Sequence, residues 1–171
     1  TKEKLPEIQL YHKTDTHWNY AGAYVGAAAL LGELQIDMPP LDDDRIQIGE
    51  MPNASSDLAD MLHLKKDLAG KETDYTITGY DAHGVYNEKW EFGTEFIYHS
   101  EGADPRKLFV YRDSFCSAMS GVLASQFNES YMIHNVFYSN SAFTEQEPDI
   151  FVLETVERYL RNLLSFDIEK G

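Results

Sequence analysis

The sequence predicts an α/β fold in which helices flank a parallel sheet, and three short apolar runs carry this prediction. These runs cover residues 107–111, 131–137 and 149–154, and segments with helical periodicity follow at 115–127 and 156–164. Strands that are buried on both faces are continuously apolar, and their alternation with helices favours parallel pairing. In such a sheet, chemistry lies at the carboxyl ends of the strands.

The remaining elements are expected around this sheet. A helix is predicted over residues 18–34, with Asn19 or Thr16 as its N-cap, and a short amphipathic helix over 56–62. The segment 38–44 is rich in proline and acid and is typical of a loop. Short aromatic and β-branched runs predict strands that form an insertion or an antiparallel flank; they lie at 75–80, 85–86, 90–92 and 95–99.

Composition limits the class of protein. The chain has 171 residues, 43% of them hydrophobic, which suits a single domain over residues 1–171. No apolar stretch approaches the ~20 residues of a membrane span, and the start without Met suggests a mature or excised fragment. The formal net charge of −15 disfavours nucleic-acid binding and makes a neutral polysaccharide, or one held in a locally basic groove, the easier polymeric partner.

We expect neither a metal nor a cofactor. The single cysteine, Cys116, follows the predicted strand within an apolar stretch and is interpreted as a core residue. The acidic run 42–44 lacks the alternating ligands of a calcium loop and is interpreted as solvated. Five histidines are scattered without metal-ligand spacing, and surface or strand positions are expected for them: His12, His63, His83, His99 and His134.

Three residues suggest acyl transfer. A serine hydroxyl becomes a good nucleophile when an imidazole removes its proton and a carboxylate orients that imidazole. Asp15 and His17 are two residues apart, so in an extended turn the carboxylate can reach the backbone-proximal ring nitrogen. Ser114 falls where a predicted strand meets a predicted helix, whose first N–H groups point at a developing oxyanion.

Each half of this pattern has another interpretation when taken alone. Asp-x-His also suits a metal site or a buried core histidine, and Asp-Ser after a strand is often only an N-cap. Together, and each in its expected structural context, the two halves favour a catalytic serine. Trp18 and Tyr11 lie beside Asp15 and His17 in sequence and are candidates to line the pocket or to stack on a sugar ring.

A resemblance to a known family rests on short motifs spread over almost the whole chain. The chain resembles the alginate O-acetyltransferase and DHHW families of SGNH-hydrolase-like proteins at residues 13–19 (KTDTHWN), 22–24 (GAY) and 111–115 (YRDSF). Residues 56–59 (SDLA) and 154–158 (ETVER) look like further family blocks. As in that family, the Asp-x-His motif precedes the serine.

The resemblance implies both a fold and a reaction. The fold would be SGNH-hydrolase-like, with a flavodoxin-like parallel sheet, truncated at the N-terminus because only 13 residues precede the TDTHW block. The reaction would move an acetyl group to hydroxyls of an exported polysaccharide through an acetyl-serine intermediate. Ser114 would be the nucleophile, His17 the base and Asp15 its orienter. Further contacts to substrate are expected from Arg112, Trp18, Asn19 and Tyr11.

The resemblance also implies partners and a location. Such proteins receive acetyl groups from a membrane-bound O-acyltransferase and work outside the cytoplasm, in the periplasm or at the cell surface. We therefore expect the full-length protein to carry a membrane tether. Two other functions fit the same residues: a carbohydrate esterase that passes the acetyl group to water, and a carbohydrate-binding domain that keeps the serine fold without catalysis.

Overall fold

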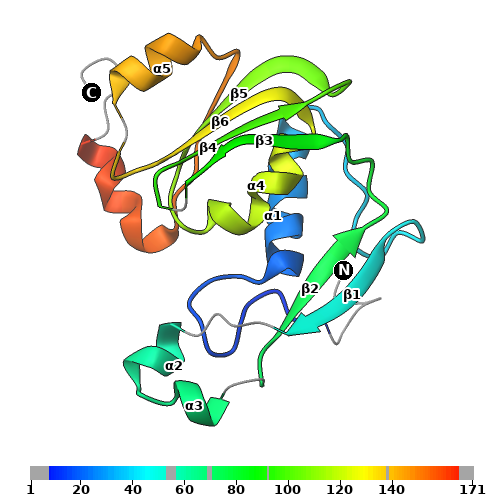
Figure 1. The fold of residues 1–171 in the computed structure, drawn as a ribbon, viewed down its shortest axis with the longest axis vertical. Coiled ribbons are helices and arrows are strands. Elements are labelled where there is room, and N and C mark those ends of the chain that lie inside the picture. Colours follow the sequence, from blue (N-terminus) through cyan, green and yellow to red (C-terminus); the bar gives the residue numbers. More distant parts are fainter. Residues whose placement is uncertain (1–7, 53–56, 69–70, 92, 138, 166–171) are drawn as a thin grey trace. The chain divides into compact units, whose positions relative to one another are not determined.

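The chain folds into two units, Thr1–Asp81 and Ala82–Gly171. The computed structural model describes residues 8–52, 57–68, 71–91, 93–137 and 139–165 (Figure 1). The single domain expected from the composition therefore stays a prediction. Among the described residues, no helix combines the length and the apolar character that crossing a membrane needs.

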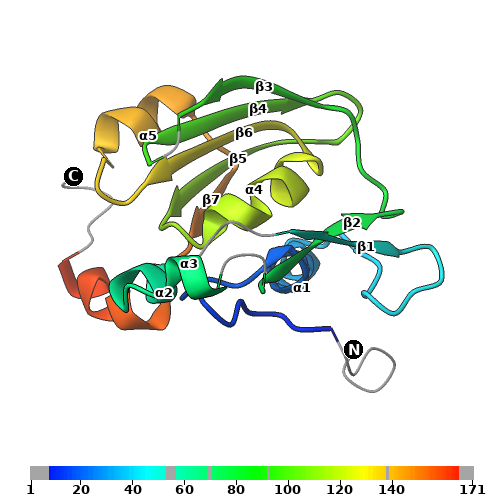
Figure 2. The same cartoon turned by 60° about the horizontal axis from the view of Figure 1, so that its bottom comes forward.

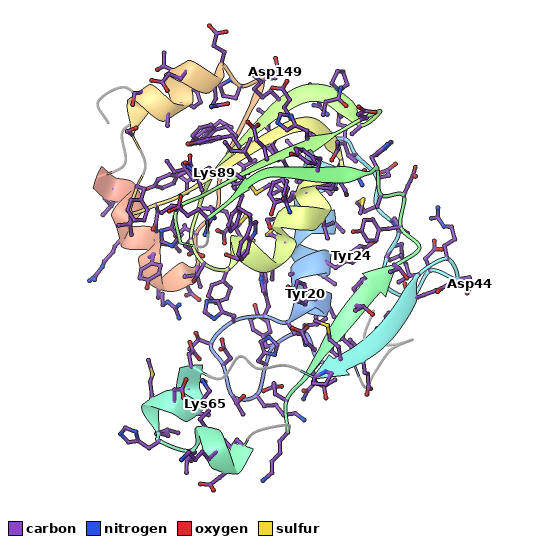
Figure 3. All side chains as sticks on the ribbon, in the orientation of Figure 1. Tyr20, Tyr24, Asp44, Lys65, Lys89 and Asp149 are labelled. Atoms are coloured by element: carbon purple, nitrogen blue, oxygen red, sulfur yellow. The ribbon has the colours of Figure 1, made fainter. Side chains whose placement is uncertain are left out.

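The first unit is built on one helix and a two-stranded antiparallel sheet. Helix α1 (Tyr20–Glu33) buries Tyr24, Ala27 and Leu31, whose spacing places them on one face. Figure 3 shows Tyr20 and Tyr24 projecting from successive turns of this helix. The Tyr24 hydroxyl donates to the carbonyl oxygen of Pro39 at 2.7 Å, which satisfies the polar end of a buried ring. The other elements of this unit are β1 (Gln47–Pro52), α2 (Asp57–Met61), α3 (Lys65–Leu68) and β2 (Thr73–Thr78).

The second unit contains a five-stranded sheet in the order β3-β4-β6-β5-β7 (Figure 2). Strand β5 pairs in parallel with β6 and with the edge strand β7, whereas β4 and β3 extend the sheet antiparallel to the other edge. The strands are β3 (Val85–Trp90), β4 (Glu95–Ser100), β5 (Asp104–Arg112), β6 (Phe127–His134) and β7 (Ile150–Leu153). The helices are α4 (Cys116–Ala124), α5 (Asn140–Gln146) and the 3₁₀ helix η1 (Glu157–Ser165).

Helices α4 and α5 cover opposite faces of this sheet. Phe109, Tyr131 and Ile133 form a buried cluster with α5, in which the rings of Phe109 and Phe143 meet edge to face at 5.5 Å. Alternation along β5 directs the neighbouring side chains to the other face, where the hydroxyl groups of Tyr98 and Ser120 of α4 lie 3.0 Å apart. This alternation also decides which pocket-forming side chains share a face.

The predicted core elements are confirmed. β5, α4, β6 and β7 lie within a few residues of the expected positions, and the parallel pairing is as expected. The sheet is mixed rather than wholly parallel, because the predicted flanking strands β3 and β4 join it antiparallel. The expected C-terminal helix is a 3₁₀ helix, and β1, α3 and α5 were not predicted. Residues 56 and 92, which belonged to predicted elements, lie outside the described residues.

Candidate functional site

Asp15 and His17 make the contact that their spacing predicts. Asp15 Oδ1 lies 2.6 Å from His17 Nδ1 and also accepts the His17 backbone N–H at 2.9 Å. The second bond is local, because a short carboxylate readily reaches the amide two residues ahead. Asp15 is buried, whereas 29% of the His17 side chain is exposed. The contact holds a proton on Nδ1, so Nε2 of the neutral ring carries the lone pair that a general base needs.

Asp57, at the start of α2, supports this pair. Its backbone N–H donates to Asp15 Oδ2 at 3.1 Å. Its carboxylate accepts the Thr16 backbone N–H at 2.7 Å and the Thr16 hydroxyl. The backbone of Leu58 also donates to the Thr14 carbonyl oxygen at 3.1 Å. The start of α2 therefore fixes the loop that presents His17.

The other side of the loop is anchored by β2 and the residue before it. Glu72 Oε2 accepts the backbone N–H groups of Lys13 and Thr14 and the Thr14 hydroxyl, each at 2.8 Å. Burial on its own would raise the pKa of Glu72, but these hydrogen bonds lower it. His12 lies between Glu72 and Asp74, with ring nitrogens 3.9 and 3.7 Å from their carboxylates. His12 is thus part of the anchor rather than a surface residue.

Asp15, His17 and Asp57 also bring three potential metal-ligand atoms within 4.8 Å of one another. However, both oxygens of each carboxylate already accept hydrogen bonds from this loop or from the start of α2. A cation would have to displace these donors. The donor set therefore suits an oriented imidazole better than a metal cage.

Asn19 and Trp18 have structural roles beside His17. Asn19 is 1% exposed and caps α1: its Oδ1 accepts the Gly22 N–H at 2.9 Å and its amide group donates to the Gln9 carbonyl oxygen at 2.8 Å. The Asn19 side chain therefore bonds to backbone groups of the protein, whereas the sequence predicted a contact with substrate. Trp18 packs on α1, where a Cβ on Gly26 would lie 2.9 Å from the indole ring. Tyr11 is 58% exposed, so its ring is accessible.

Ser114 lies in the turn between β5 and α4, as predicted. Asp113 holds this turn: its Oδ1 accepts the Phe115 N–H at 2.8 Å and its Oδ2 accepts the Val156 N–H at 2.7 Å. The Asp113 N–H donates to Glu154 Oε2 at 2.9 Å. One backbone donor that the sequence suggested for an oxyanion, that of Phe115, is therefore already used.

Arg112 and Cys116 are buried beneath this turn. The Arg112 guanidinium is centred 4.1 Å from the ring centroid of Phe96, and the residue is 1% exposed. Burial lowers the pKa of Arg112, and its Nη1 reaches the Ser117 hydroxyl only at 3.4 Å. Direct contact with substrate, expected from the sequence, does not fit this burial. Burial raises the pKa of the Cys116 thiol well above its usual value, in agreement with its interpretation as a core residue.

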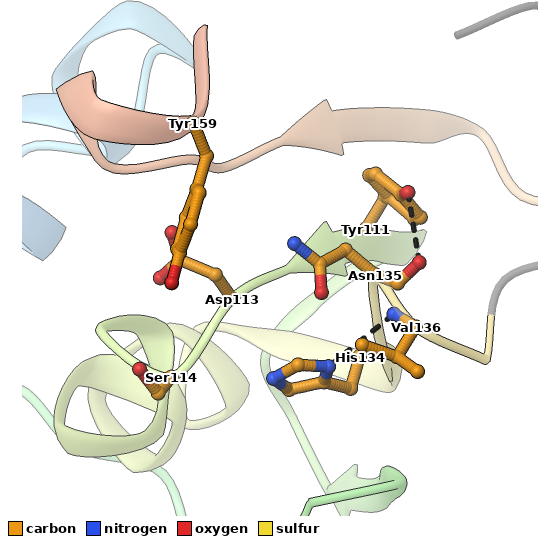
Figure 4. A pocket seen from close by; sticks show the side chains of 7 residues that line it. All are labelled: Tyr111, Asp113, Ser114, His134, Asn135, Val136 and Tyr159. Carbon is orange, nitrogen blue, oxygen red and sulfur yellow. Dashed lines mark hydrogen bonds between the residues drawn. The ribbon is translucent and has the colours of Figure 1, made fainter. Parts of the chain in front are cut away.

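A pocket of about 330 Å³ opens beside Ser114 (Figure 4). His134 and Asn135, at the end of β6, lie in it because β6 pairs in parallel with β5 and both strands end at the same edge. Tyr111 supports the rim by donating from its hydroxyl to the Asn135 carbonyl oxygen at 3.0 Å. Tyr159 comes from η1 and closes another side. Asp15 and His17 belong to the first unit and Ser114 to the second, so the triad stays a prediction.

Solved structures resemble this chain, although no protein-family model matches it and no curated protein matches it significantly by sequence. A DHHW family protein from Eubacterium siraeum matches with a TM-score of 0.67 at 15% identity, over 88% of this chain and 59% of that one. Two structures of Bacillus cereus PatB1, one with a sulfonyl adduct, match with a TM-score of 0.64 at 15% identity over 99% of this chain. The chain has the fold of a DHHW family protein.

The DHHW resemblance expected from the sequence is thereby confirmed at the level of the fold. A weaker likeness, with a TM-score of 0.49 at 20% identity, is to the O-acetyltransferase domain of Pseudomonas putida AlgJ. The chain spans 59% of the DHHW protein and 66 to 68% of PatB1.

Within this DHHW-like fold, the sequence reasoning missed Asp57 and His134 as parts of the site. In the sequence Asp57 is only part of the family block SDLA, and its partner Thr16 is 41 residues away. In the sequence His134 is one of five histidines without metal-ligand spacing. Its position at the end of an apolar strand, next to Asn135, was the available signal, because parallel strands place such residues at one edge.

Replacing Asp57 with alanine is expected to lower the free energy of unfolding by about 1–2 kcal/mol. The substitution leaves the Thr16 N–H and hydroxyl without their acceptor. Urea-induced unfolding measures the loss, and amide exchange at Thr16 and His17 should become faster. Asp60→Ala is the matched control, because Asp60 lies on the same helix in an exposed ion pair with Lys65 that contributes little. Equal stability of both variants would contradict the anchoring role of Asp57.

Proposed function

We propose that this protein is a serine-dependent O-acetyltransferase of the SGNH-hydrolase-like type that acetylates polysaccharide hydroxyls through an acetyl-Ser114 intermediate. The observation that carries the proposal is the 2.6 Å contact between Asp15 Oδ1 and His17 Nδ1 in a DHHW-like fold. A carboxylate that holds an imidazole in one tautomer is the arrangement that activates a serine. The turn that exposes Ser114 to a pocket supplies the second half of the proposal.

The proposed reaction has two matched steps. His17 Nε2 takes the Ser114 hydroxyl proton while Ser114 Oγ bonds to the carbonyl carbon of an acetyl ester. The intermediate collapses, its bond to the leaving oxygen breaks, and that oxygen receives the proton from His17. In the second step His17 deprotonates a sugar hydroxyl, whose oxygen attacks the acetyl-serine. The bond from the acetyl carbon to Ser114 Oγ then breaks, and His17 returns the proton to Ser114. Asp15 stabilises the imidazolium in both steps.

The net charge of the protein limits which polysaccharides can accept the acetyl group. With a formal charge of −15, the protein repels anionic polymers at long range. We therefore propose a neutral polysaccharide as the acceptor. From the motif resemblance we also propose a membrane-bound O-acyltransferase as the acetyl source and a location outside the cytoplasm. Transfer to a neutral oligosaccharide should exceed transfer to a uronate oligosaccharide of equal length, and added salt should reduce the difference. Faster transfer to the uronate at low salt would contradict the neutral acceptor.

The test of the function is the acetyl intermediate itself. The purified protein is incubated with 4-nitrophenyl acetate, and intact mass with peptide mapping should locate an acetyl group on Ser114. On addition of oligosaccharide, the adduct should move to sugar faster than it hydrolyses. Hydrolysis without transfer would indicate the esterase, and absence of an adduct would favour the carbohydrate-binding alternative. An adduct that forms equally in Ser114→Ala would exclude Ser114 as the nucleophile.

A further inference from the structure

The pocket beside Ser114 contains a second imidazole, that of His134, to which the proposed mechanism gives no role. Both residues belong to the second unit, and both line the same cavity (Figure 4). The following inference rests on the proposed function and adds a catalytic residue to it.

One hydrogen bond decides the tautomer of His134. The backbone N–H of Val136 donates to His134 Nδ1 at 3.3 Å. An amide donor requires a lone pair on Nδ1, so the proton of the neutral ring resides on Nε2. In Figure 4, Nδ1 faces Val136, and the other ring nitrogen points to the side of the pocket where Ser114 lies.

The surroundings favour the neutral form of this ring. Burial lowers the pKa of His134, and the positive charge of Arg112 lowers it further, whereas Asp113 opposes the shift. Arg112 is the register partner of His134 on β5, so the two side chains lie on the same face of the sheet. A neutral ring with its proton on Nε2 presents a hydrogen-bond donor to the pocket and has no lone pair there to act as a base.

The backbone around His134 is held in place. Its N–H donates to the Thr94 carbonyl oxygen at 2.7 Å, and its carbonyl oxygen accepts the Phe137 N–H at 2.8 Å. The next N–H, that of Asn135, donates to the Arg112 carbonyl oxygen at 2.7 Å. A donor fixed before the reaction stabilises developing charge without the cost of reorganisation. One backbone donor of the Ser114 turn, the Phe115 N–H, is already used by Asp113, so a side-chain donor from β6 would add to the stabilisation of the oxyanion.

We propose that the His134 Nε2–H donates a hydrogen bond to the oxyanion formed when Ser114 attacks the acetyl group. As the bond from Ser114 Oγ to the carbonyl carbon forms, the carbonyl electron pair moves onto oxygen, and His134 stabilises it. The serine proton goes to the separate base. The electron pair returns when the leaving oxygen departs, and His134 keeps its own proton throughout.

A matched pair of variants tests this role. In His134→Gln, the side-chain amide places an N–H close to the position of Nε2, whereas His134→Met has a similar length and no donor. With 4-nitrophenyl acetate, the Met variant should acylate Ser114 about 10²–10³ times more slowly at saturating ester, with little change in KM. The Gln variant should stay within about tenfold of the wild type, because it retains one donor. Its pH–rate profile should follow that of the wild type.

Three results would overturn the inference. If both the Gln and the Met variant acylate Ser114 at the wild-type rate, no donor is needed at position 134. If both are equally slow, His134 acts as a base or only packs against its neighbours. Nitrogen-15 NMR of the wild-type imidazole provides a readout that does not depend on activity: a His134 proton on Nδ1, or a cationic ring at neutral pH, would exclude the donor. A wild-type protein that forms no acetyl-Ser114 would overturn the function and this inference together, whereas the other outcomes concern His134 alone.

Discussion

Replacing either Ser114 or His17 with alanine is expected to slow formation of the acetyl-enzyme by about 10⁴-fold or more. Without Ser114 the attacking oxygen is absent, and without His17 its proton has no acceptor. Because the residues act as a unit, the double variant should be no slower than either single variant. The rate is measured by intact mass at fixed times after mixing with 4-nitrophenyl acetate.

Asp15→Ala should slow formation of the acetyl-enzyme about a hundredfold less than either of these changes. Nucleophile and base both remain, and only the orientation of the imidazole and the charge of its partner are lost. His99→Gln is the control, because His99 is exposed and its Nε2 contacts a carboxylate oxygen of Glu88 on the neighbouring strand β3 at 2.8 Å. Additive losses in the Ser114 and His17 double variant would show that the two residues do not act in one step.

Replacing Glu154 with glutamine is expected to stabilise the protein above pH 7 by about 3 kcal/mol. Burial, and after it the negative charge of Asp113, raises the pKa of Glu154 from 4.5 to about 7. Between these values the folded protein holds a proton that the unfolded chain has released. The wild-type free energy of unfolding therefore loses this contribution as pH rises from about 4.5 to about 7.

Glutamine at position 154 removes the titrating carboxyl group and keeps the hydrogen bond from Asp113. Its side-chain carbonyl oxygen can still accept the Asp113 N–H that Glu154 accepts at 2.9 Å. Urea unfolding at pH 4 should give equal free energies of unfolding for the variant and the wild type. The difference in favour of the variant should grow as the pH rises to 8. Glu101→Gln, in an exposed turn, should change stability by less than about 0.5 kcal/mol at any pH. A Glu154→Gln protein that is less stable at pH 8 would mean that an ionised Glu154 supports the Ser114 turn.

Local features of the sequence were sufficient for much of the fold and for two parts of the site. The contact between Asp15 and His17 spans two residues, and the Asn19 cap serves an amide three residues away, so both follow from short-range geometry. The turn with Ser114 follows from an apolar strand that ends beside a segment of helical periodicity. These signals need no knowledge of the rest of the chain.

Only the tertiary structure decided the contacts between segments that are far apart in the sequence. His134 reaches the Ser114 pocket through the parallel register of β5 and β6, and a shift of one residue would have turned it to the other face. Asp57 supports Thr16 across 41 residues. Arg112 looks like a site residue because it is charged and lies next to the serine turn, but strand alternation directs it under Phe96. Sequence spacing encodes neighbours within a few residues, whereas burial and strand register depend on the whole packed unit.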